Sequence, residues 1–254
     1  MRLYLAENLK YKHTFTGKLW FLMQALTLLL AYGISRGNGI NSAYNWWYIL
    51  MLPGMVTLFT CLVGEKDRQM KNRVVLSFPA RMGRIWDAKI LVGMKALLFS
   101  NLFGAIANFV LAQYLLPAFW MPQVLEISPE QTVAAAAVMT ITTLWQIPFC
   151  LWLNQRFGIL PTLVINLILN GSGTLMAVTP YWLLNPWAIL PRLMTAIIGI
   201  LPNGLLAIPE SMTYTPGITD TDSILPGILV TLVWLVLLWG VSRLWYDRKG
   251  AQTV

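Results

Sequence analysis

Long apolar segments separated by short polar ones run along almost the whole chain. A helix needs about 20 mostly apolar residues to cross the hydrocarbon core of a membrane. The pattern therefore predicts an all-α membrane protein in a single domain, residues 1–254. Six segments reach or approach the required length, and each is expected to form one span: Leu19–Ile34, Trp47–Val63, Ala88–Leu116, Val133–Leu153, Ile159–Val178 and Ile224–Trp245.

A seventh apolar stretch, Pro186–Ile208, differs from these six because prolines and glycines interrupt it. Proline removes a backbone donor and breaks the helical hydrogen-bond ladder, which a straight span needs intact. We therefore expect two short helices or a re-entrant hairpin here, within an outer segment of residues 179–223.

Basic residues indicate the orientation of the spans. With the N-terminus inside, only Arg36 and Arg192 of the 18 Lys and Arg residues fall outside. An excess of basic residues is typical of cytoplasmic loops. Counting Pro186–Ile208 as a span would move the basic C-terminal end outside and weaken this bias. The sequence therefore predicts both termini in the cytoplasm, with residues 246–254 as a short tail.

Composition favours a membrane protein over a soluble or nucleic-acid-binding one. Hydrophobic residues make up 57% of the chain and charged residues only 11%, whereas charged residues make up about 25% of a typical soluble domain. We interpret the net charge of +8 as cytoplasmic bias and attraction to anionic lipid. Membrane lipid is thus an expected partner, and nucleic acid is not.

The first 18 residues mix apolar and basic side chains, which favours a short amphipathic helix on the inner membrane surface. His13, the only histidine, lies here and is expected at the surface rather than as a catalytic base. Lys95 is the one candidate partner for a membrane-embedded serine hydrolase, but we favour a side chain that extends to the interface. Cys61 and Cys150 show no metal-ligand spacing, so we expect two buried apolar side chains.

Two absences limit the chemistry that the chain can carry alone. No Asp or Glu lies within a predicted span, although proton- or sodium-coupled carriers usually need an ionisable group there. The sequence also has no GxxxxGK[ST] loop for a nucleotide phosphate. We therefore expect no cofactor bound by this chain and no catalytic residues.

Small and amide side chains recur at helical spacing in two of the predicted spans, and such stripes allow helices to approach closely. We expect packing within the chain, with a face that meets a second membrane subunit as the alternative. The stripe residues are Ser100, Gly104 and Asn108 in the third span and Asn166, Asn170 and Gly173 in the fifth.

The cytoplasmic loop 64–87 combines a charged run, an apolar patch ending at Phe78, and a basic turn after Pro79. It is either a solvated basic connector or a surface that docks into a cytoplasmic partner. The apolar patch favours docking, because exposed apolar surface tends to be buried by a partner. The candidate interface residues are Glu65, Lys66, Asp67, Arg68, Phe78, Pro79, Arg81, Trp86 and Lys89.

This loop resembles that of six-helix exporter-type ABC transporter permeases. Their loop has an acidic residue, a Leu/Phe-Pro step, a basic turn and a lysine entering the third helix, and Glu65, Phe78-Pro79, Arg81 and Lys89 match in that order. More narrowly, the chain resembles the E-type permeases of lantibiotic-immunity transporters, the MutE/EpiE group. The matching stretches are Asn45–Tyr48, Leu52–Gly54, Lys66–Arg73, Ile85–Lys89 and Pro202–Gly204.

The resemblance implies a permease in the plasma membrane of a bacterium that pairs with a second related permease and two copies of a separate ATPase. ATP and Mg²⁺ would bind to that ATPase, and the complex would expel lantibiotic peptide and confer immunity or resistance. The family fold places loop 64–87 and the N-terminal helix against the ATPase. Candidate cargo contacts on the outer side are Trp46, Trp47 and Glu210.

Two other functions stay open from the sequence. One is a permease of the same architecture with another cargo, such as a lipid, a drug or a polysaccharide. The other is a membrane-embedded enzyme or scaffold that works without an ATPase.

Overall fold

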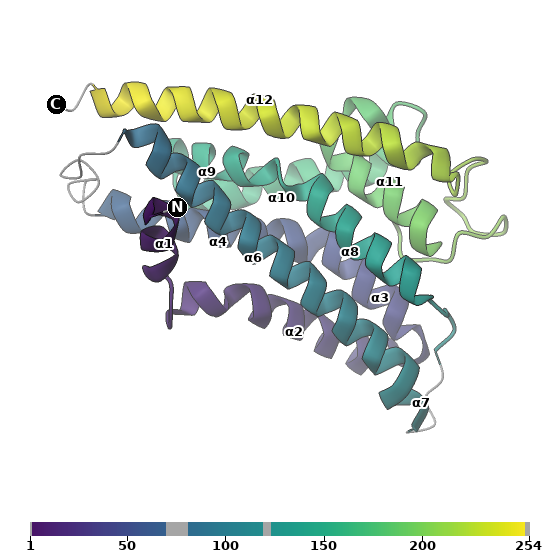
Figure 1. The fold of residues 1–254 in the computed structure, drawn as a ribbon. Coiled ribbons are helices and arrows are strands. Elements are labelled where there is room, and N and C mark those ends of the chain that lie inside the picture. Colours follow the sequence, from purple (N-terminus) through teal and green to yellow (C-terminus); the bar gives the residue numbers. More distant parts are fainter. Residues whose placement is uncertain (1, 70–80, 119–122, 252–254) are drawn as a thin grey trace.

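The computed structural model describes residues 2–69, 81–118 and 123–251, and apart from one isolated bridge, between Ile200 and Leu206, all regular structure in these ranges is helical. The helices lie side by side in an elongated bundle (Figure 1). The six that are long and apolar enough to cross a membrane are Phe15–Ser35, Gly39–Asp67, Met82–Ala118, Pro129–Phe157, Ile159–Met176 and Thr221–Arg248. The prediction of an all-helical protein with six such helices is confirmed.

Within these spans the individual helices follow the labels of Figure 1. Their bounds are α1 Arg2–Leu9, α2 Phe15–Ser35, η1 Arg36–Asn38, α3 Gly39–Trp46, η2 Trp47–Met51, α4 Leu52–Gln69, α6 Met82–Val110, η3 Leu111–Leu115, α7 Leu116–Ala118, α8 Pro129–Thr143, α9 Gln146–Phe157, α10 Ile159–Met176, η4 Trp182–Leu184, α11 Pro186–Ile198, η5 Thr221–Ser223 and α12 Ile224–Ala251.

The second span is longer than the predicted segment Trp47–Val63. It starts at α3, passes through the π-helical turn η2 and continues along α4 into the cytoplasmic loop predicted from the sequence. Asn41 and Asn45 in α3 are buried, so polar residues face the interior of the protein there. A hydropathy pattern cannot include such residues in a span, because they lower the apolar average.

The fourth span is broken into α8 and α9, where the sequence predicted the single segment Val133–Leu153. Helix α8 begins with a capping box, in which the side chains of Ser128 and Gln131 each bond to the backbone N–H of the other residue. A turn separates the two helices just before Pro148. Proline lacks the N–H that would bond to the carbonyl of Leu144, which accounts for the interruption.

The stretch Pro186–Ile208 does not form a seventh span. Its first part is α11, with 13 residues, capped at its start by the Asn185 side chain. The helix ends at Gly199, whose φ of 68° lies in the left-handed region that favours glycine. The rest of the stretch is irregular, so one helix replaces the expected pair. Helix α11 packs against α8, α10 and α12.

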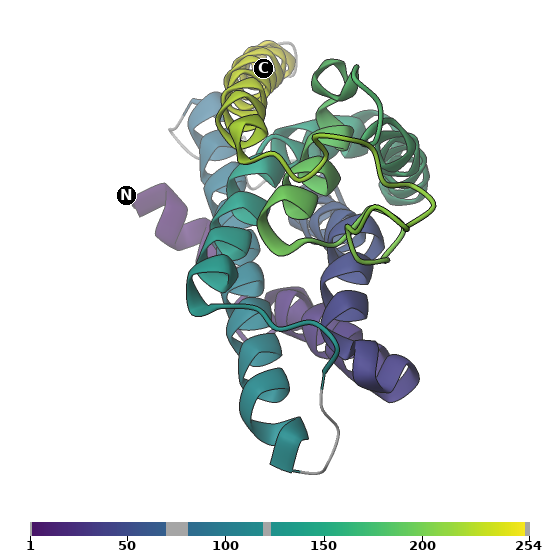
Figure 2. The same ribbon diagram turned by 90° about the vertical axis from the view of Figure 1, so that its right-hand side faces the viewer.

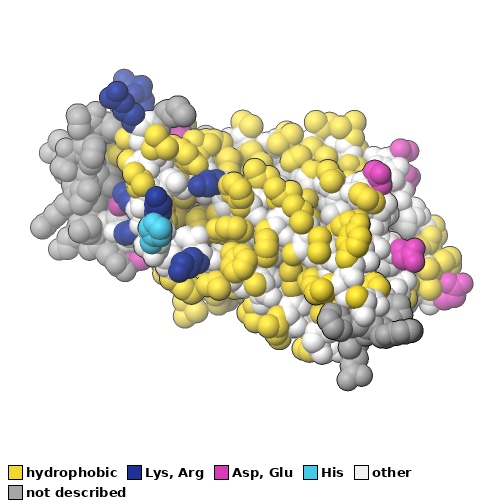
Figure 3. Space-filling model, turned by 60° about the horizontal axis from the view of Figure 1, so that its bottom comes forward, with side chains coloured by type: hydrophobic (Ala, Val, Ile, Leu, Met, Phe, Trp, Pro, Cys, Tyr) yellow, Lys and Arg dark blue, Asp and Glu magenta, His cyan; other side chains and the backbone are white. Residues whose placement is uncertain are grey.

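Charge and hydrophobicity divide the surface along the bundle axis. Figure 3 shows Lys and Arg side chains gathered towards one end, acidic side chains mostly at the other, and a broad hydrophobic band between them. Both chain ends lie at the basic end (Figure 1), as an even number of spans requires. Helix α12 runs along the edge of the bundle in the end-on view of Figure 2. Only 17% of an apolar 18-residue stretch of this span is buried. Its bare apolar face suits contact with lipid.

We expect the basic end to lie in the cytoplasm, and cysteine labelling of intact cells tests this. Met212 is 93% exposed at the acidic end, and Arg248 is exposed at the basic end. A membrane-impermeant maleimide should label Met212→Cys from outside and Arg248→Cys only after permeabilisation. The native Cys61 and Cys150 are both 0% exposed, so background labelling should be low. The opposite labelling pattern would reverse the orientation.

Candidate functional site

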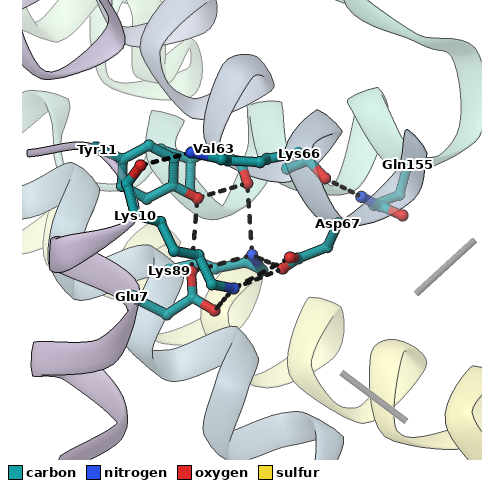
Figure 4. Close-up of polar contacts among 9 residues, drawn as sticks. Glu7, Lys10, Tyr11, Val63, Lys66, Asp67, Lys89 and Gln155 are labelled. Carbon is teal, nitrogen blue, oxygen red and sulfur yellow. Dashed lines mark hydrogen bonds and ion pairs between the residues drawn. The ribbon is translucent and has the colours of Figure 1, made fainter. Parts of the chain in front are cut away.

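Two acidic and two basic side chains meet at the basic end of the bundle (Figure 4). Glu7 comes from α1, Lys10 from the turn after it, Asp67 from the last turn of α4, and Lys89 from α6. Glu7 and Asp67 are each 4% exposed, and Lys89 is 1% exposed. Glu7, Lys10, Asp67 and Lys89 are called the ion cluster below. Their formal charges sum to zero, and they lie largely within the protein interior.

Each lysine of the ion cluster contacts both carboxylates. Lys89 Nζ lies 3.3 Å from Glu7 Oε2 and also forms an ion pair with Asp67 Oδ2. Lys10 Nζ lies 2.7 Å from Glu7 Oε1 and 3.0 Å from Asp67 Oδ1. Because every charge has two partners of opposite sign, these contacts offset the desolvation cost that an unpaired buried charge would carry.

Tyr11, in the turn after α1, lies beside the ion cluster. Its hydroxyl donates to the carbonyl oxygen of Val63 at 3.0 Å. Burial, together with the charges of Glu7 and Asp67, raises the pKa of Tyr11, so this hydroxyl stays protonated as a donor. Burial by itself would lower the pKa of Lys10, but its bonds to Glu7 and Asp67 outweigh burial and raise that pKa. Lys10 is therefore charged at neutral pH.

The ion cluster joins the two helices that flank residues 70–80. Helix α4 leads into that segment and α6 follows it. The N-terminal segment is tied to α4 by a further bond, in which Lys66 Nζ donates to the carbonyl oxygen of Lys10 at 2.5 Å. On the other side of α4, Gln155 of α9 donates to the carbonyl oxygen of Gly64 at 3.4 Å. The ends of these helices at the basic end of the bundle are thus fixed to one another.

The start of α6 is also bound to the end of α12. Trp86 stacks on Tyr246, with ring centroids 4.5 Å apart. Asp87 pairs with Arg243, with 3.0 Å between Oδ2 and Nε. Helix α12 runs to Ala251, so it extends into the stretch after residue 245 that the sequence predicted as a tail, and Asp247 accepts a hydrogen bond from the N–H of Gly83 on α6. The physical reason is that its inner face keeps partners on α6 beyond the apolar run.

The structure separates the residues that the sequence placed on a docking surface. Asp67, Trp86 and Lys89 are buried within the chain, which corrects their expected place on that surface: they hold the flanking helices together instead. Lys66 and Arg81 are exposed. Of the other candidates, Glu65 and Arg68 belong to α4, and Phe78 and Pro79 lie outside the described residues.

The stripe of small residues in α6 is covered by α2 of the same chain. Ser100 Oγ donates to a backbone oxygen of α2 at 2.9 Å. A Cβ atom at Gly104 would lie only 1.8 Å from Gln24 Nε2. Asn108 Oδ1 accepts a hydrogen bond from the hydroxyl of Tyr32. These residues are therefore used for packing within the chain and are not exposed to a second subunit.

The polar residues of α10 likewise face other helices of this chain. Asn166 Nδ2 donates to Thr57 Oγ1 of α4 at 2.9 Å, and Asn166 Oδ1 accepts from Trp187 Nε1 of α11 at 2.9 Å. Asn170 donates to a backbone oxygen of η2. Gly173 lies directly against Trp187. Hydrogen bonds of the Asn166 side-chain amide thus join α10 to α4 and to α11.

At the acidic end, the candidate cargo contacts have different positions. Trp47 is 1% exposed, and its Nε1 donates to Asn101 Oδ1 at 2.8 Å, so it is a core residue rather than the predicted cargo contact. Glu210 is exposed. Trp46 lines a cavity of about 580 Å³ at this end, which is named the outer cavity after the orientation expected from the sequence. Four asparagines also line that cavity: Asn38, Asn41, Asn45 and Asn203.

The N-terminal half of the ion cluster, Glu7, Lys10 and Tyr11, is absent from the site residues predicted from the sequence. The first 18 residues predict a helix on the membrane surface, whereas α1 packs against α6 with Glu7 buried. The spacing of Glu7, Lys10 and Tyr11 gives a usable signal, since residues three and four apart share one helical face. An acid, a base and a tyrosine on a common face indicate a polar contact with another element.

Within the part of the chain that the structure describes, no three His, Cys, Asp or Glu side chains come together as a metal site would require. Cys61 and Cys150 are free thiols in the interior. Comparison of the chain with protein-family models, with curated proteins and with solved structures finds no match.

Proposed function

We propose that this chain is the permease subunit of an ATP-driven ABC exporter that removes lantibiotic peptide from the plasma membrane of a bacterium. A second related permease and two copies of a separate ATPase complete the complex, and ATP and Mg²⁺ bind to the ATPase. Support comes from the resemblance in loop 64–87 and from the six long apolar helices.

The observation that carries the proposal is the ion cluster beside residues 70–80. Asp67 and Lys89 pair across the two helices that flank this segment. Glu7 of α1 pairs with Lys89, and Lys10, just after α1, pairs with Asp67. Separating a buried ion pair costs several kcal/mol, so the three helices move together when a partner pushes on the segment. Helix α12 follows, because it is bound to the start of α6 through Trp86 and Asp87.

A separate ATPase is the energy source that fits this arrangement. Where the spanning helices carry carboxylates, as at Asp67, Asp87 and Glu130, these lie near the helix ends. Carriers driven by protons or sodium usually need such groups at depth in the membrane. Energy delivered at the cytoplasmic end through α4 and α6 requires no ionisable group at mid-membrane.

The outer cavity is the proposed place of cargo contact, and its lining also favours a second cargo class. Asparagine amides and the Trp46 ring can bond and stack against a neutral polar ligand. Asn41 is 5% exposed, and its Oδ1 accepts no hydrogen bond within the described chain. A polysaccharide, which is rich in hydroxyl donors, suits such a lining and is the alternative cargo of the same exporter.

Co-purification in mild detergent tests the exporter function. The tagged chain, expressed in its native cells, should co-purify with an ATP-hydrolysing partner. The rate of ATP hydrolysis should rise when lantibiotic peptide is added and not when polysaccharide is added. Phe78→Asp should remove that partner, because burying one large apolar side chain contributes about 1.5–3 kcal/mol to an interface. The measurement is ATP hydrolysis in the eluate, with and without each cargo.

Met212→Asp is the matched control, since it places the same acid on a residue that is 93% exposed at the opposite end. The Met212→Asp variant should still co-purify with the ATPase. Absence of an ATPase from the wild-type eluate would contradict the exporter function. Equal recovery with Phe78→Asp would contradict docking through loop 64–87, and stimulation by polysaccharide alone would favour the alternative cargo.

A further inference from the structure

A cavity of about 470 Å³ opens between the N-terminal segment and α6 at the basic end of the bundle. Its lining has two chemically distinct parts. One part carries basic side chains, and the other is aromatic and aliphatic. The basic part consists of Lys12, His13, Lys18 and Lys95, and the apolar part includes Trp20, Phe59, Val92, Ala96 and Phe99.

No carboxylate lies among the residues that line this cavity. The nearest acid of the N-terminal segment, Glu7, is buried and already paired with Lys10 and Lys89. Lys12 and Lys18 are both exposed, so their charges face the cavity mouth without a neutralising partner in its wall. The basic rim therefore attracts an anion, and Figure 3 shows Lys or Arg side chains close to the histidine.

The chain reversal between α1 and α2 builds the rim. His13 has a φ of 62°, an uncommon conformation for a residue with a side chain. Thr14 Oγ1 donates to the carbonyl oxygen of Tyr11 at 2.8 Å, and the N–H of Gly17 donates to Thr14 Oγ1 at 3.3 Å. A Cβ atom at Gly17 would lie 2.2 Å from that same carbonyl oxygen. The turn is thus tightly packed, and Lys12 within it and Lys18 after it both line the cavity.

The apolar part of the cavity continues onto bare hydrophobic surface. Phe99 is 46% exposed, and its neighbours Leu98 and Leu102 on α6 are 50% and 46% exposed. Lys95, one turn before Phe99, keeps its Nζ 3.2 Å from Asn8 Oδ1 and above the Phe99 ring. A molecule in this cavity would therefore meet cations at the end of the bundle and apolar surface along its side.

We infer that this cavity binds an anionic glycerophospholipid of the inner leaflet. The phosphate group contacts Lys12, Lys18 and Lys95, and the acyl chains lie against Phe99 and the apolar surface beside it. Only an amphiphile with one anionic end uses both parts of the lining. The inference needs the membrane location and orientation of the chain but not the exporter function.

Native mass spectrometry of the full chain in mild detergent tests the site, with phosphatidylglycerol and phosphatidylcholine of identical acyl chains as probes. The wild-type chain should prefer phosphatidylglycerol. The triple variant Lys12→Gln, Lys18→Gln, Lys95→Gln should lose affinity for it on the order of a hundredfold, since each basic side chain near an anionic surface contributes about a factor of five. Its affinity for phosphatidylcholine should change far less.

A matched triple variant, Arg81→Gln, Arg84→Gln, Arg248→Gln, removes the same charge from exposed residues at the same end and outside the cavity. It should bind phosphatidylglycerol nearly as the wild type does. Equal losses in the two triple variants would overturn the site, because the effect would then come from net charge alone.

Two further comparisons separate a lipid from a free anion. Phe99→Ala should weaken the binding of both phospholipids, whereas Leu237→Ala, at an exposed residue of α12 outside the cavity lining, should not. Inorganic phosphate should fail to displace phosphatidylglycerol at equal concentration. Displacement by phosphate, or no effect of Phe99→Ala, would overturn the inference that the occupant is a lipid.

Discussion

Replacing Lys89 with methionine should destabilise the bundle by about 3–5 kcal/mol, the usual cost of removing one partner from a buried ion pair. Glu7 and Asp67 would then share the single ammonium group of Lys10 in a site with little access to water. The measurement is the free energy of unfolding in a dodecyl sulfate titration, followed by tryptophan fluorescence.

Two controls make this result specific to the ion cluster. Arg84→Met also replaces a basic side chain of α6 with methionine, but at an exposed residue, and should shift the free energy by at most about 0.5 kcal/mol. The double variant Lys89→Met, Asp67→Asn restores neutrality and should recover much of the loss. Equal effects of Lys89→Met and Arg84→Met would show that the cluster does not stabilise the bundle.

Gly173→Ala should destabilise the contact between α10 and α11 by about 1–3 kcal/mol, the usual cost of overpacking a close contact. A Cβ atom there would lie 2.5 Å from the carbonyl carbon and the Cβ of Trp187 and 2.8 Å from the backbone nitrogen of Ala188. Backbone atoms cannot rotate away as a flexible side chain can, so the two helices must separate. The same unfolding titration measures the loss.

Gly171→Ala is the matched control on the same helix. Nothing lies within 4 Å of a Cβ atom at Gly171, so the methyl group meets no clash. Alanine is favoured over glycine inside a helix by about 1 kcal/mol, so this variant should be as stable as the wild type or more stable. Destabilisation by Gly171→Ala as large as that by Gly173→Ala would rule out the close approach of α11 as the cause.

The spans were predictable because their signal is local. The length of each apolar run and the positions of Lys and Arg indicate six crossings without any knowledge of packing. The interrupted stretch Pro186–Ile208 was also recognisable as something other than a span, because Pro186, Pro191 and Gly199 punctuate it. Span ends were less accurate, since buried polar residues such as Asn41 and Asp67 extend the helices beyond the apolar runs.

The candidate site was less predictable because its contacts join distant parts of the chain. Asp67 and Lys89 were singled out as charged residues of one loop, but nothing local shows that they face each other and Glu7 in the interior. Trp47 illustrates the same limit. Its residue type favours a membrane interface, and only the partner Asn101, on another helix, explains its burial.

The ion cluster divides into two neutral halves, and this gives the N-terminal segment a property of its own. That segment brings one acid and one base, Glu7 and Lys10, while the bundle keeps one acid and one base, Asp67 and Lys89. If the segment lifts away, neither side is left with a stranded charge. Separating the segment from the bundle would therefore cost the ion pairs Lys10–Asp67 and Lys89–Glu7 and the burial of Tyr11, but would create no uncompensated charge inside the protein.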